Sequence, residues 1–256
     1  MELQDRVVVV TGGGNGIGAA LARRFAAEGA AAVVVADLDG EAALSVASEI
    51  GGRGRQLDVT DEPAVAALVA EVVRELGRID LYCSNAGIAL GRGPETPDED
   101  WRRIWDVNSM SHVLMARHVV PAMLEAGGGY LLGTISAAGL LNAMTSAPYG
   151  MTKAAALSFF EWLAIAYGDQ IRVSCLCPQG VRTRMLEADD GMAELLRESA
   201  LTPEQVAASV VAGLGEERFL ILPHPEVATY FERKASDYDR WLRGMRRLRA
   251  TLTRRA

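Results

Sequence analysis

Short apolar runs alternate with longer segments of helical periodicity along the chain. Seven runs, most of them rich in valine, leucine and isoleucine, have the length of strands: 6–10, 31–37, 52–59, 79–84, 129–136, 171–177 and 218–223. Between them, apolar residues recur every three or four positions, which predicts helices over 16–28, 40–50, 61–76, 98–125, 148–167 and 202–213. Wholly apolar strands are typical of parallel sheets buried between two helical layers. The pattern therefore predicts an α/β fold, a doubly wound sheet of seven mainly parallel strands with helices on both faces.

No linker rich in proline, glycine or serine divides the chain, so residues 1–256 are interpreted as a single domain. Three segments interrupt the alternation, at 88–100, 137–147 and 182–200. Each follows a predicted strand, so all three are expected at the carboxyl edge of the sheet, where open α/β folds bind ligands. We interpret them as substrate loops. Their apolar residues either line a pocket or only pack on the scaffold: Leu90, Leu140, Leu141, Met144, Met185, Leu186, Met192, Leu195 and Leu196.

The C-terminal tail, about 235–253, has the pattern of an amphipathic helix. Trp241, Met245, Leu248 and Leu252 recur at spacings of four, three and four, and arginines surround them. An anionic membrane could attract such a helix, but the chain as a whole is acidic and the apolar stripe is short. Docking on a neighbouring subunit, or over the substrate mouth, is therefore the favoured interpretation.

Composition narrows the class of protein. Half of the 256 residues are hydrophobic, and the net charge of −7 argues against nucleic acid as a partner. No apolar run approaches the roughly 18 residues of a membrane helix, so we expect no membrane association and a cytoplasmic location. Cys83, Cys175 and Cys177 fall in predicted strands and are interpreted as buried thiols. The scattered histidines give no metal-ligand spacing, so no metal site is expected.

The stretch TGGGNGIG, residues 11–18, directly follows four valines and precedes a helical pattern. Gly12, Gly16 and Gly18 in this context indicate a tight turn whose backbone lies open to a pyrophosphate at a helix N-terminus. A close strand-to-helix turn without a ligand is the alternative. Asp37 favours the ligand, because it ends the next strand at a position where a carboxylate can accept hydrogen bonds from both ribose hydroxyls of an adenosine. The same carboxylate would repel a 2′-phosphate, which favours NAD over NADP.

The motif YGMTK places Tyr149 and Lys153 four residues apart at the start of a predicted helix, so both lie on one face. A phenol with a pKa near 10 exchanges protons poorly at pH 7 unless a positive charge stabilises the phenolate. Lys153 supplies that charge, and Ser136, at the end of the preceding strand, could face the same point. The pair is expected to act in acid–base catalysis.

Taken together and in this order, TGGGNGIG, SNAG at 84–87, Asn108, Ser136 and the Tyr149/Lys153 pair closely resemble the classical short-chain dehydrogenase/reductase family over about the first 220 residues. The resemblance implies an NAD(P)-dependent oxidoreductase on a Rossmann-type sheet. Ser136 would orient the substrate oxygen and Tyr149 would exchange its proton. Lys153 would hold the nicotinamide ribose and lower the tyrosine pKa, and Asn108 would support a water that links the lysine to solvent.

The same resemblance implies a full set of cofactor-binding residues: Gly12, Asn15, Gly16, Ile17, Gly18, Asp37, Leu38, Asp58, Val59, Asn85, Ala86, Gly87, Tyr149, Lys153, Pro178, Gly180, Val181 and Thr183. Two positions depart from the family pattern. Gln179 stands where a glycine is usual, and Ser84 stands where the family often has asparagine. The first puts the backbone path of the 178–183 loop in question, whereas the second is expected to change only local hydrogen bonds.

The expected activity is NAD-dependent interconversion of a secondary alcohol and a ketone, with an apolar substrate of moderate size. Family members are commonly dimers or tetramers, so a homo-oligomer assembled in part through the helices 98–125 and 148–167 is also expected. Two alternatives stay open: an NADPH-dependent 3-oxoacyl reductase, which Asp37 disfavours, and a non-catalytic dinucleotide-sensing protein on the same fold, which the retained Ser136, Tyr149, Lys153 and Asn108 disfavour.

Overall fold

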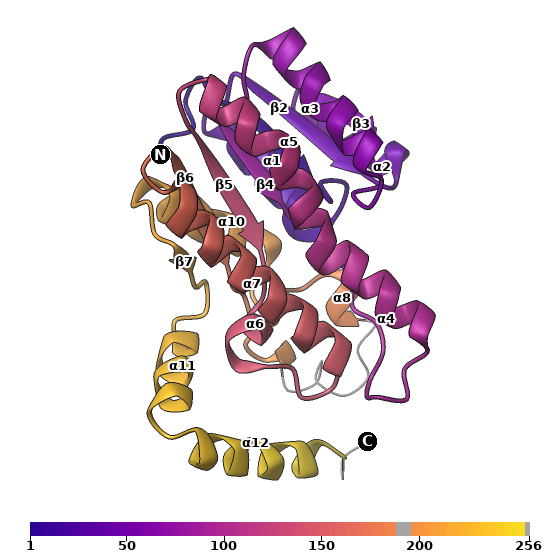
Figure 1. Cartoon of the computed structure of the whole chain (residues 1–256), viewed down its shortest axis with the longest axis vertical. Helices are drawn as coiled ribbons and strands as arrows, with labels where there is room; N and C mark the ends of the chain where they lie inside the picture. The colour runs from indigo at the N-terminus through magenta and orange to yellow at the C-terminus, as the bar shows by residue number, and fades with distance from the viewer. Residues whose placement is uncertain (188–195, 254–256) are drawn as a thin grey trace.

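A computed structural model describes residues 1–187 and 196–253 (Figure 1). Its seven strands form one sheet in the order β3-β2-β1-β4-β5-β6-β7, with every neighbouring pair parallel. The strands are β1 (Val7–Thr11), β2 (Ala32–Asp37), β3 (Arg53–Gln56), β4 (Leu81–Ser84), β5 (Gly129–Thr134), β6 (Ile171–Leu176) and β7 (Leu220–Ile221). This arrangement confirms the predicted α/β fold of the Rossmann type, in which the strand order reverses beside β1 and opens a crevice at the carboxyl edge.

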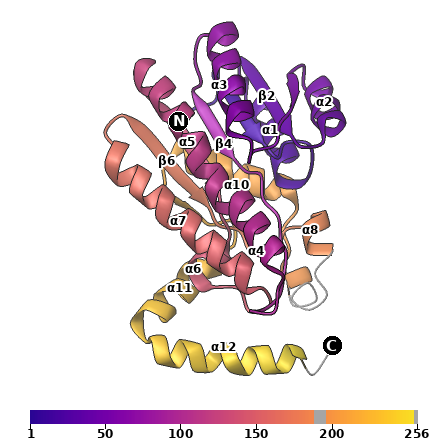
Figure 2. The same cartoon turned by 45° about the vertical axis from the view of Figure 1, so that its right-hand side comes forward.

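Helices cover both faces of the sheet (Figures 1 and 2). One face carries α1 (Gly16–Ala27), α2 (Gly40–Glu49) and α10 (Pro203–Gly215), and the other carries α3 (Glu62–Leu76), α5 (Ser111–Glu125) and α7 (Ala147–Tyr167). Strand β1 serves both layers, because its alternate side chains point to opposite faces: Val7 and Val9 join one core cluster, Val8 and Val10 the other. This is why four consecutive valines, Val7 to Val10, are all buried in this strand.

The predicted helix 98–125 is interrupted. Helix α4 (Asp98–Trp105) passes through a single π-helical turn, η1 (Asp106–Met110), into α5. The extra residue in such a turn shifts the faces of the two flanking helices, and π turns are frequent at functional sites. Apolar periodicity could not indicate this break, since α-helical pattern continues on both sides of it.

Three further elements were not predicted. The segment 137–147, interpreted as a loop, begins with the one-turn helix α6 (Ala137–Leu141), and 182–200 contains α8 (Arg184–Glu187). The third is α11 (Glu226–Ser236), after which α12 (Tyr238–Thr253) accounts for the tail. The last strand is also shorter than the predicted 218–223. Helices of one turn carry too few residues to show a period, which is why the sequence pattern missed α6 and α8.

Helices α11 and α12 extend away from the sheet below its carboxyl edge (Figures 1 and 2). Helix α11 packs against α6 and α12, whereas most residues of α12 are exposed. Within the described ranges, no helix combines the length and the apolar character that crossing a membrane requires.

Candidate active site

The glycine-rich turn joins β1 to α1. Gly12 and Gly16 have φ values of +62° and +51°, in the left-handed region that favours glycine. A Cβ on Gly18 would overlap the carbonyl oxygen of Gly12 and lie 2.6 Å from Nδ2 of Asn85. Asn15, the N-cap of α1, makes no side-chain cap bond, and Ile17 follows in the first turn. The turn therefore presents bare backbone and an uncapped helix N-terminus at the carboxyl edge of the sheet.

Asp37 ends β2 beside this turn. Its Oδ2 accepts a hydrogen bond from the Gly14 backbone N–H at 2.9 Å, and its Oδ1 accepts one from Asp39 at 3.0 Å. Asp39 in turn caps α2 by accepting from the Ala42 N–H. Helix capping is therefore performed by Asp39, and the Asp37 carboxylate is held against the glycine-rich turn. Leu38, between them, is largely exposed.

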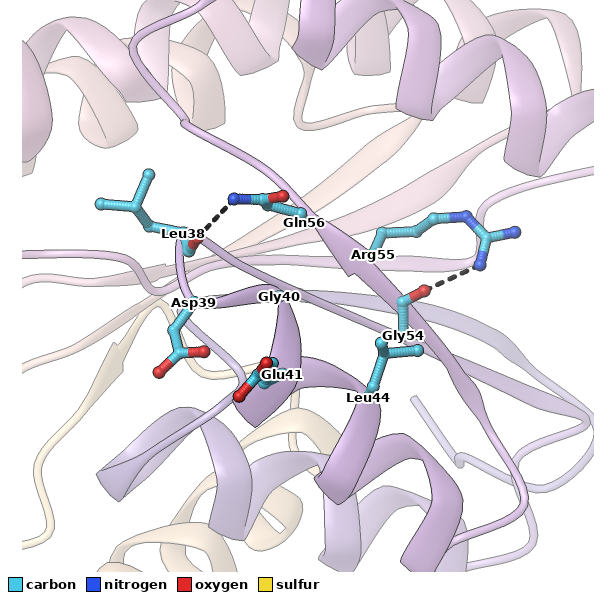
Figure 3. Close-up of a pocket in the computed structure, with 8 residues that line it drawn as sticks. All are labelled: Leu38, Asp39, Gly40, Glu41, Leu44, Gly54, Arg55 and Gln56. Atoms are coloured by element: carbon cyan, nitrogen blue, oxygen red, sulfur yellow. Dashed lines mark hydrogen bonds between the residues drawn. The ribbon is translucent and has the colours of Figure 1, made fainter.

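A hollow of about 610 Å³ lies beside the turn between β2 and α2, which follows Asp37 (Figure 3). It is bounded by the β2–α2 turn, by α2 and by the edge strand β3, and its lining residues are Leu38, Asp39, Gly40, Glu41, Leu44, Gly54, Arg55 and Gln56. None of the proton-transfer candidates lines it, so this hollow is not a substrate pocket for them.

Asn85 ties three strands together at the same edge. Its Nδ2 donates to the carbonyl oxygens of Thr11 (3.0 Å) and Gly12 (3.2 Å), and its Oδ1 accepts from Oγ1 of Thr134 at 2.9 Å. The side chain thus fixes the glycine-rich turn relative to β4 and β5. The Ala86 backbone also lies against the glycine-rich turn, since a Cβ on Gly12 would lie 2.9 Å from the Ala86 Cα.

Asn108 lies in the π turn η1 and is fully buried. Its Nδ2 donates to the Ile88 carbonyl oxygen at 2.8 Å, while its Oδ1 accepts from the Ile88 N–H at 2.9 Å. Gly87 lies immediately beside it, because a Cβ at that position would be 3.3 Å from Asn108 Oδ1 and 3.2 Å from Lys153 Nζ. Asn108, Gly87 and Lys153 therefore meet at one point.

Tyr149 and Lys153 lie one turn apart near the start of α7, whose N-cap Ser146 accepts a hydrogen bond from the Tyr149 N–H at 3.2 Å. The Lys153 Nζ lies 5.9 Å from the centre of the Tyr149 ring and donates to the Thr134 carbonyl oxygen at 3.0 Å. The Ser136 hydroxyl, at the N-cap of α6, lies close enough to Tyr149 to lower the pKa of the phenol by hydrogen bonding. The structure therefore brings Ser136, Tyr149 and Lys153 together.

Burial dominates the electrostatics of this cluster. It lowers the pKa of Lys153 to about 8, since a charged amine is poorly solvated there. It also raises the pKa of Tyr149, and the hydrogen bond from Ser136 only partly opposes that rise. Burial therefore sets the direction of the Tyr149 pKa shift in the protein alone, and the lowering expected from Lys153 stays a prediction. Below them, burial raises the pKa of the Cys177 thiol to about 12, which keeps it neutral.

The loop after β6 carries the other predicted cofactor-binding residues. The Pro178 carbonyl oxygen accepts from the Ala137 N–H at 2.8 Å, and Val181 forms a parallel bridge with Leu201. Thr183 faces the glycine-rich turn, since a Cβ on Gly16 would lie 3.0 Å from its Cγ2. Gly180 packs closely against Leu196.

Gln179, the departure from the family pattern, is accommodated by hydrogen bonds. Its backbone N–H donates to His224 Nδ1 at 3.2 Å, and its Nε2 donates to Glu226 Oε1 at 3.0 Å. Its φ is not positive, so a glycine is not required here. The second departure, Ser84, places its Oγ 2.7 Å from Nδ1 of the buried His112.

Asp58 and Val59 follow β3 at the same edge. Asp58 is exposed, and its Oδ1 accepts from the Thr60 N–H and hydroxyl at 2.9 and 2.7 Å. Val59 packs against the core. Sequence reasoning missed Thr134, whose carbonyl oxygen binds Lys153 and whose hydroxyl binds Asn85; its only signal is a polar residue at the end of an apolar strand.

The substrate loops are described in part. Leu140 is buried, whereas Leu90, Leu141, Met144, Leu186 and Leu196 are half-buried and Met185 is exposed. Met192 and Leu195 lie outside the described residues. The described residues contain no cluster of three or more His, Cys, Asp or Glu side chains that could hold a metal ion.

The parallel sheet, the glycine-rich turn and the cluster at its carboxyl edge define a Rossmann-type α/β protein. Residues 6–193 match the model of the short chain dehydrogenase family, so the chain belongs to the short-chain dehydrogenase/reductases, a family of oxidoreductases. It is 38% identical over 236 residues to the 1-deoxy-11-beta-hydroxypentalenate dehydrogenase of Streptomyces exfoliatus, which covers 88% of this chain and 86% of that protein.

Two solved structures share the fold at 26% sequence identity. A short-chain dehydrogenase/reductase from Burkholderia phymatum in complex with NAD has a TM-score of 0.83, and the match covers 93% of this chain and 96% of that one. A 7α-hydroxysteroid dehydrogenase, complexed with NADH and 7-oxo glycochenodeoxycholic acid, has a TM-score of 0.78 over 86% of this chain and 94% of that one.

Proposed function

We propose that this protein catalyses the NAD-dependent interconversion of a secondary alcohol and a ketone, with an apolar substrate of moderate size. The observation that carries the proposal is the cluster of Ser136, Tyr149 and Lys153, in which a buried amine lies beside a phenol that a serine hydroxyl contacts. A half-buried tyrosine beside a buried amine suits a proton exchanged with a ligand oxygen.

The residues at the carboxyl edge fit a dinucleotide. The glycine-rich turn packs so closely against Asn85 and Ala86 that no Cβ fits at Gly12 or Gly18, and the uncapped start of α1 offers N–H groups to a pyrophosphate. Asp37 would accept hydrogen bonds from the adenosine ribose, with Leu38, Asp58 and Val59 around the adenine. Asn85, Ala86 and Gly87 would line the ribose, and the residues from Pro178 to Thr183 the nicotinamide. Asp37 offers a 2′-phosphate only repulsion, which supports NAD.

The chemistry of the chain's own residues follows from this placement. Bound NAD supplies a hydride acceptor, and NADH a hydride donor. In oxidation, the Tyr149 phenolate accepts the proton of the substrate hydroxyl, and the Ser136 hydroxyl orients the substrate oxygen. Lys153, charged at pH 7, stabilises the phenolate and holds the nicotinamide ribose. Asn108 supports the proton path by fixing the Ile88 backbone beside Lys153. In reduction, Tyr149 donates the proton instead.

The substrate class is inferred from the loops and the relatives. Half-buried Leu90, Leu141 and Met144 offer apolar surface around the cluster. Two of the similar proteins carry names that refer to a hydroxypentalenate and a hydroxysteroid. We therefore propose a cyclic, apolar alcohol or ketone as the substrate class to test first with this protein.

The decisive experiment compares the wild type with Tyr149→Phe, using NADH fluorescence against a panel of hydroxysteroids, terpenoid alcohols, aliphatic alcohols, sugars and acyl ketones. We expect turnover in the wild type, a loss of about a thousandfold or more in kcat for Tyr149→Phe, and an unchanged Kd for NADH. NADH binding without turnover in either protein would instead support the sensing alternative. A kcat/KM at least tenfold higher with NADPH than with NADH would support the 3-oxoacyl reductase alternative and contradict our reading of Asp37.

We further propose a homo-oligomer, dimer or tetramer, built in part on α7 and located in the cytoplasm. The outer face of α7 exposes Met151, Trp162 and Ile165, the last with 85% of its surface accessible. Exposed apolar residues grouped along one helix indicate a protein interface more often than a bare surface. Light scattering after gel filtration should give a multiple of 27.4 kDa. Trp162→Glu with Ile165→Glu should reduce that mass, whereas a monomeric wild type would contradict the proposal.

A further inference from the structure

Helix α6 carries the candidate catalytic Ser136 at its N-cap and has only five residues. Isolated helices of this length are unstable in water, because the hydrogen bonds of a single turn do not offset the entropic cost of nucleation. The position of Ser136 therefore depends on what holds α6 from outside. The helix packs against α7 on one side and against α11 on another.

Helix α11 contacts the C-terminal end of α6 directly. The Lys234 Nζ donates a hydrogen bond to the Leu140 carbonyl oxygen, in the last turn of α6. The last four carbonyl groups of a helix lack partners within it, and a cation there also interacts favourably with the helix dipole. The same Nζ lies 5.5 Å from the centre of the Tyr238 ring, which restrains it further.

The N-terminal end of α6 is reached from α11 through the loop after β6. Glu226, the first residue of α11, accepts the hydrogen bond from Gln179 Nε2, and His224, two residues earlier, accepts from the Gln179 N–H. The preceding Pro178 carbonyl oxygen accepts from the Ala137 N–H at 2.8 Å and from Ser136 Oγ at 3.5 Å. A continuous set of contacts thus runs from α11 to Ser136.

We propose that Gln179 and Lys234 are positioning residues that, by anchoring the two ends of α6 to α11, hold the Ser136 hydroxyl in place for Tyr149. The inference rests on the proposed function for its consequence in catalysis, but the anchoring itself is a property of the chain. Gln179 occupies a position where the family usually has glycine, so the N-terminal anchor requires a residue particular to this sequence. Misplacement of a catalytic group by about 1 Å can cost about a hundredfold in rate.

The test replaces each anchor without disturbing the core. Lys234→Met removes the donor and keeps the aliphatic stem, and Gln179→Leu removes the contact with Glu226 while keeping the backbone N–H to His224. Lys234→Arg retains a donor and serves as the conservative rescue. Arg233→Met removes the same charge from an exposed position on the same helix and is the matched control.

Two measurements are made on each variant. The first is steady-state kinetics, in which Lys234→Met and Gln179→Leu should lower kcat by about fivefold or more and leave the Kd for NADH within about twofold. The second is the ultraviolet titration of the Tyr149 phenolate, taken as the difference from the same variant carrying Tyr149→Phe. Because the Ser136 hydrogen bond lowers the pKa of Tyr149, its loss should move this titration to higher pH.

The neighbours of Tyr149 that carry charge or titrate, Lys153 and Cys177, are unchanged in every variant, so the shift reports on Ser136. Lys234→Arg and Arg233→Met should titrate as the wild type does. The proposal is overturned if both anchor variants titrate like the wild type, or if Arg233→Met shifts as far as they do. Should no panel alcohol be oxidised, the proposed function fails, but the titration, which needs no turnover, still decides this inference.

Discussion

The Lys153 Nζ lies 5.9 Å from the centre of the Tyr149 ring, and only 3% of the lysine's surface is accessible. Its one hydrogen bond in the described part of the chain goes to the Thr134 carbonyl oxygen. Burial with so few partners destabilises the charged form of the Lys153 amine, and its pKa therefore falls from 10.5 to about 8. The fold therefore bears the cost of burying this amine, which is typical of residues retained for function.

Replacing Lys153 should show this cost as a pH-dependent stability difference. Since the folded-state pKa is depressed, the unfolded chain binds more protons between about pH 8 and 10.5, and the wild type gains stability as the pH rises through that window. Lys153→Met has no such group. We expect its advantage in free energy of unfolding over the wild type to shrink by about 3 kcal/mol from pH 8 to above 10.

Urea denaturation of both proteins at several pH values gives this difference, and activity measured on the same samples should be lost in Lys153→Met. Taking the difference cancels the ionisation of Cys83 and Cys175, which both proteins share and which Lys153 does not influence. A difference that stays constant across the window would show that the Lys153 amine is not desolvated by folding.

Gly18 should tolerate no side chain. A Cβ there would overlap the Gly12 carbonyl oxygen and approach Asn85 Nδ2 to 2.6 Å, and a hydrogen bond between these two groups, just after β1 and β4, holds both in place. We expect Gly18→Ala to lower the free energy of unfolding by about 2 kcal/mol or more and to abolish measurable NADH binding. Gly215, in the last turn of α10, has no atom within 4 Å of the equivalent Cβ, so Gly215→Ala is the control and should leave both quantities nearly unchanged. Thermal unfolding and fluorescence titration would check the pair, and equal effects in the two variants would contradict the steric argument.

The sequence could predict the parts of the site that rest on local motifs, but not the parts that rest on contacts between residues far apart in the chain. The glycine-rich turn, Asp37 and the Tyr149/Lys153 spacing are local patterns, and parallel topology alone brings their strand ends to one edge. The fold follows from the same patterns. Thr134 could not be found this way, because its importance comes from Lys153 on α7 and Asn85 after β4, which only the folded chain brings near.

The contacts of Gln179 also could not be predicted from the sequence. The sequence marks Gln179 as unusual, yet its two partners, His224 and Glu226, lie more than forty residues further along, in a segment with no predicted element. Likewise, nothing in the apolar pattern of 98–125 indicates the π turn that carries Asn108 inward. Such features depend on tertiary packing and require coordinates.

Asp37 should control the choice of cofactor. Its carboxylate is held by backbone donors at Gly14 and Asp39, and the neighbouring Leu38 is exposed and apolar. Asp37→Ser with Leu38→Arg removes the repulsion and adds a cation for a 2′-phosphate, so we expect the ratio of kcat/KM for NADH to that for NADPH to fall by about a hundredfold or more. Leu38→Arg alone is the control, and it should shift the ratio much less while Asp37 remains. An unchanged ratio in the double variant would place the ribose elsewhere.

The hydrogen bond between Ser84 and His112 should stabilise the fold through a ring that stays neutral. Burial and the nearby Lys153 charge lower the pKa of His112 to about 3, and its Nε2 has no partner among the described residues. Ser84→Ala would leave the second ring nitrogen unpaired as well, at a cost of about 1 to 3 kcal/mol in free energy of unfolding.

His112→Phe in the Ser84→Ala background removes both unpaired nitrogens and keeps an aromatic ring against Phe160, 5.2 Å away in the wild type. We therefore expect the double variant to be more stable than Ser84→Ala alone, and a double-mutant cycle by urea denaturation measures the coupling. His112 also contributes to the loss in free energy of unfolding at acid pH. With a folded-state pKa far below its ordinary value of 6.5, it contributes stability above that value which is lost as the pH falls toward 3, so the variants without His112 should lose less stability between pH 6.5 and 4. If the acid limbs of the two curves superimpose, the ring is protonated in the folded state and the neutral pair with Ser84 does not exist.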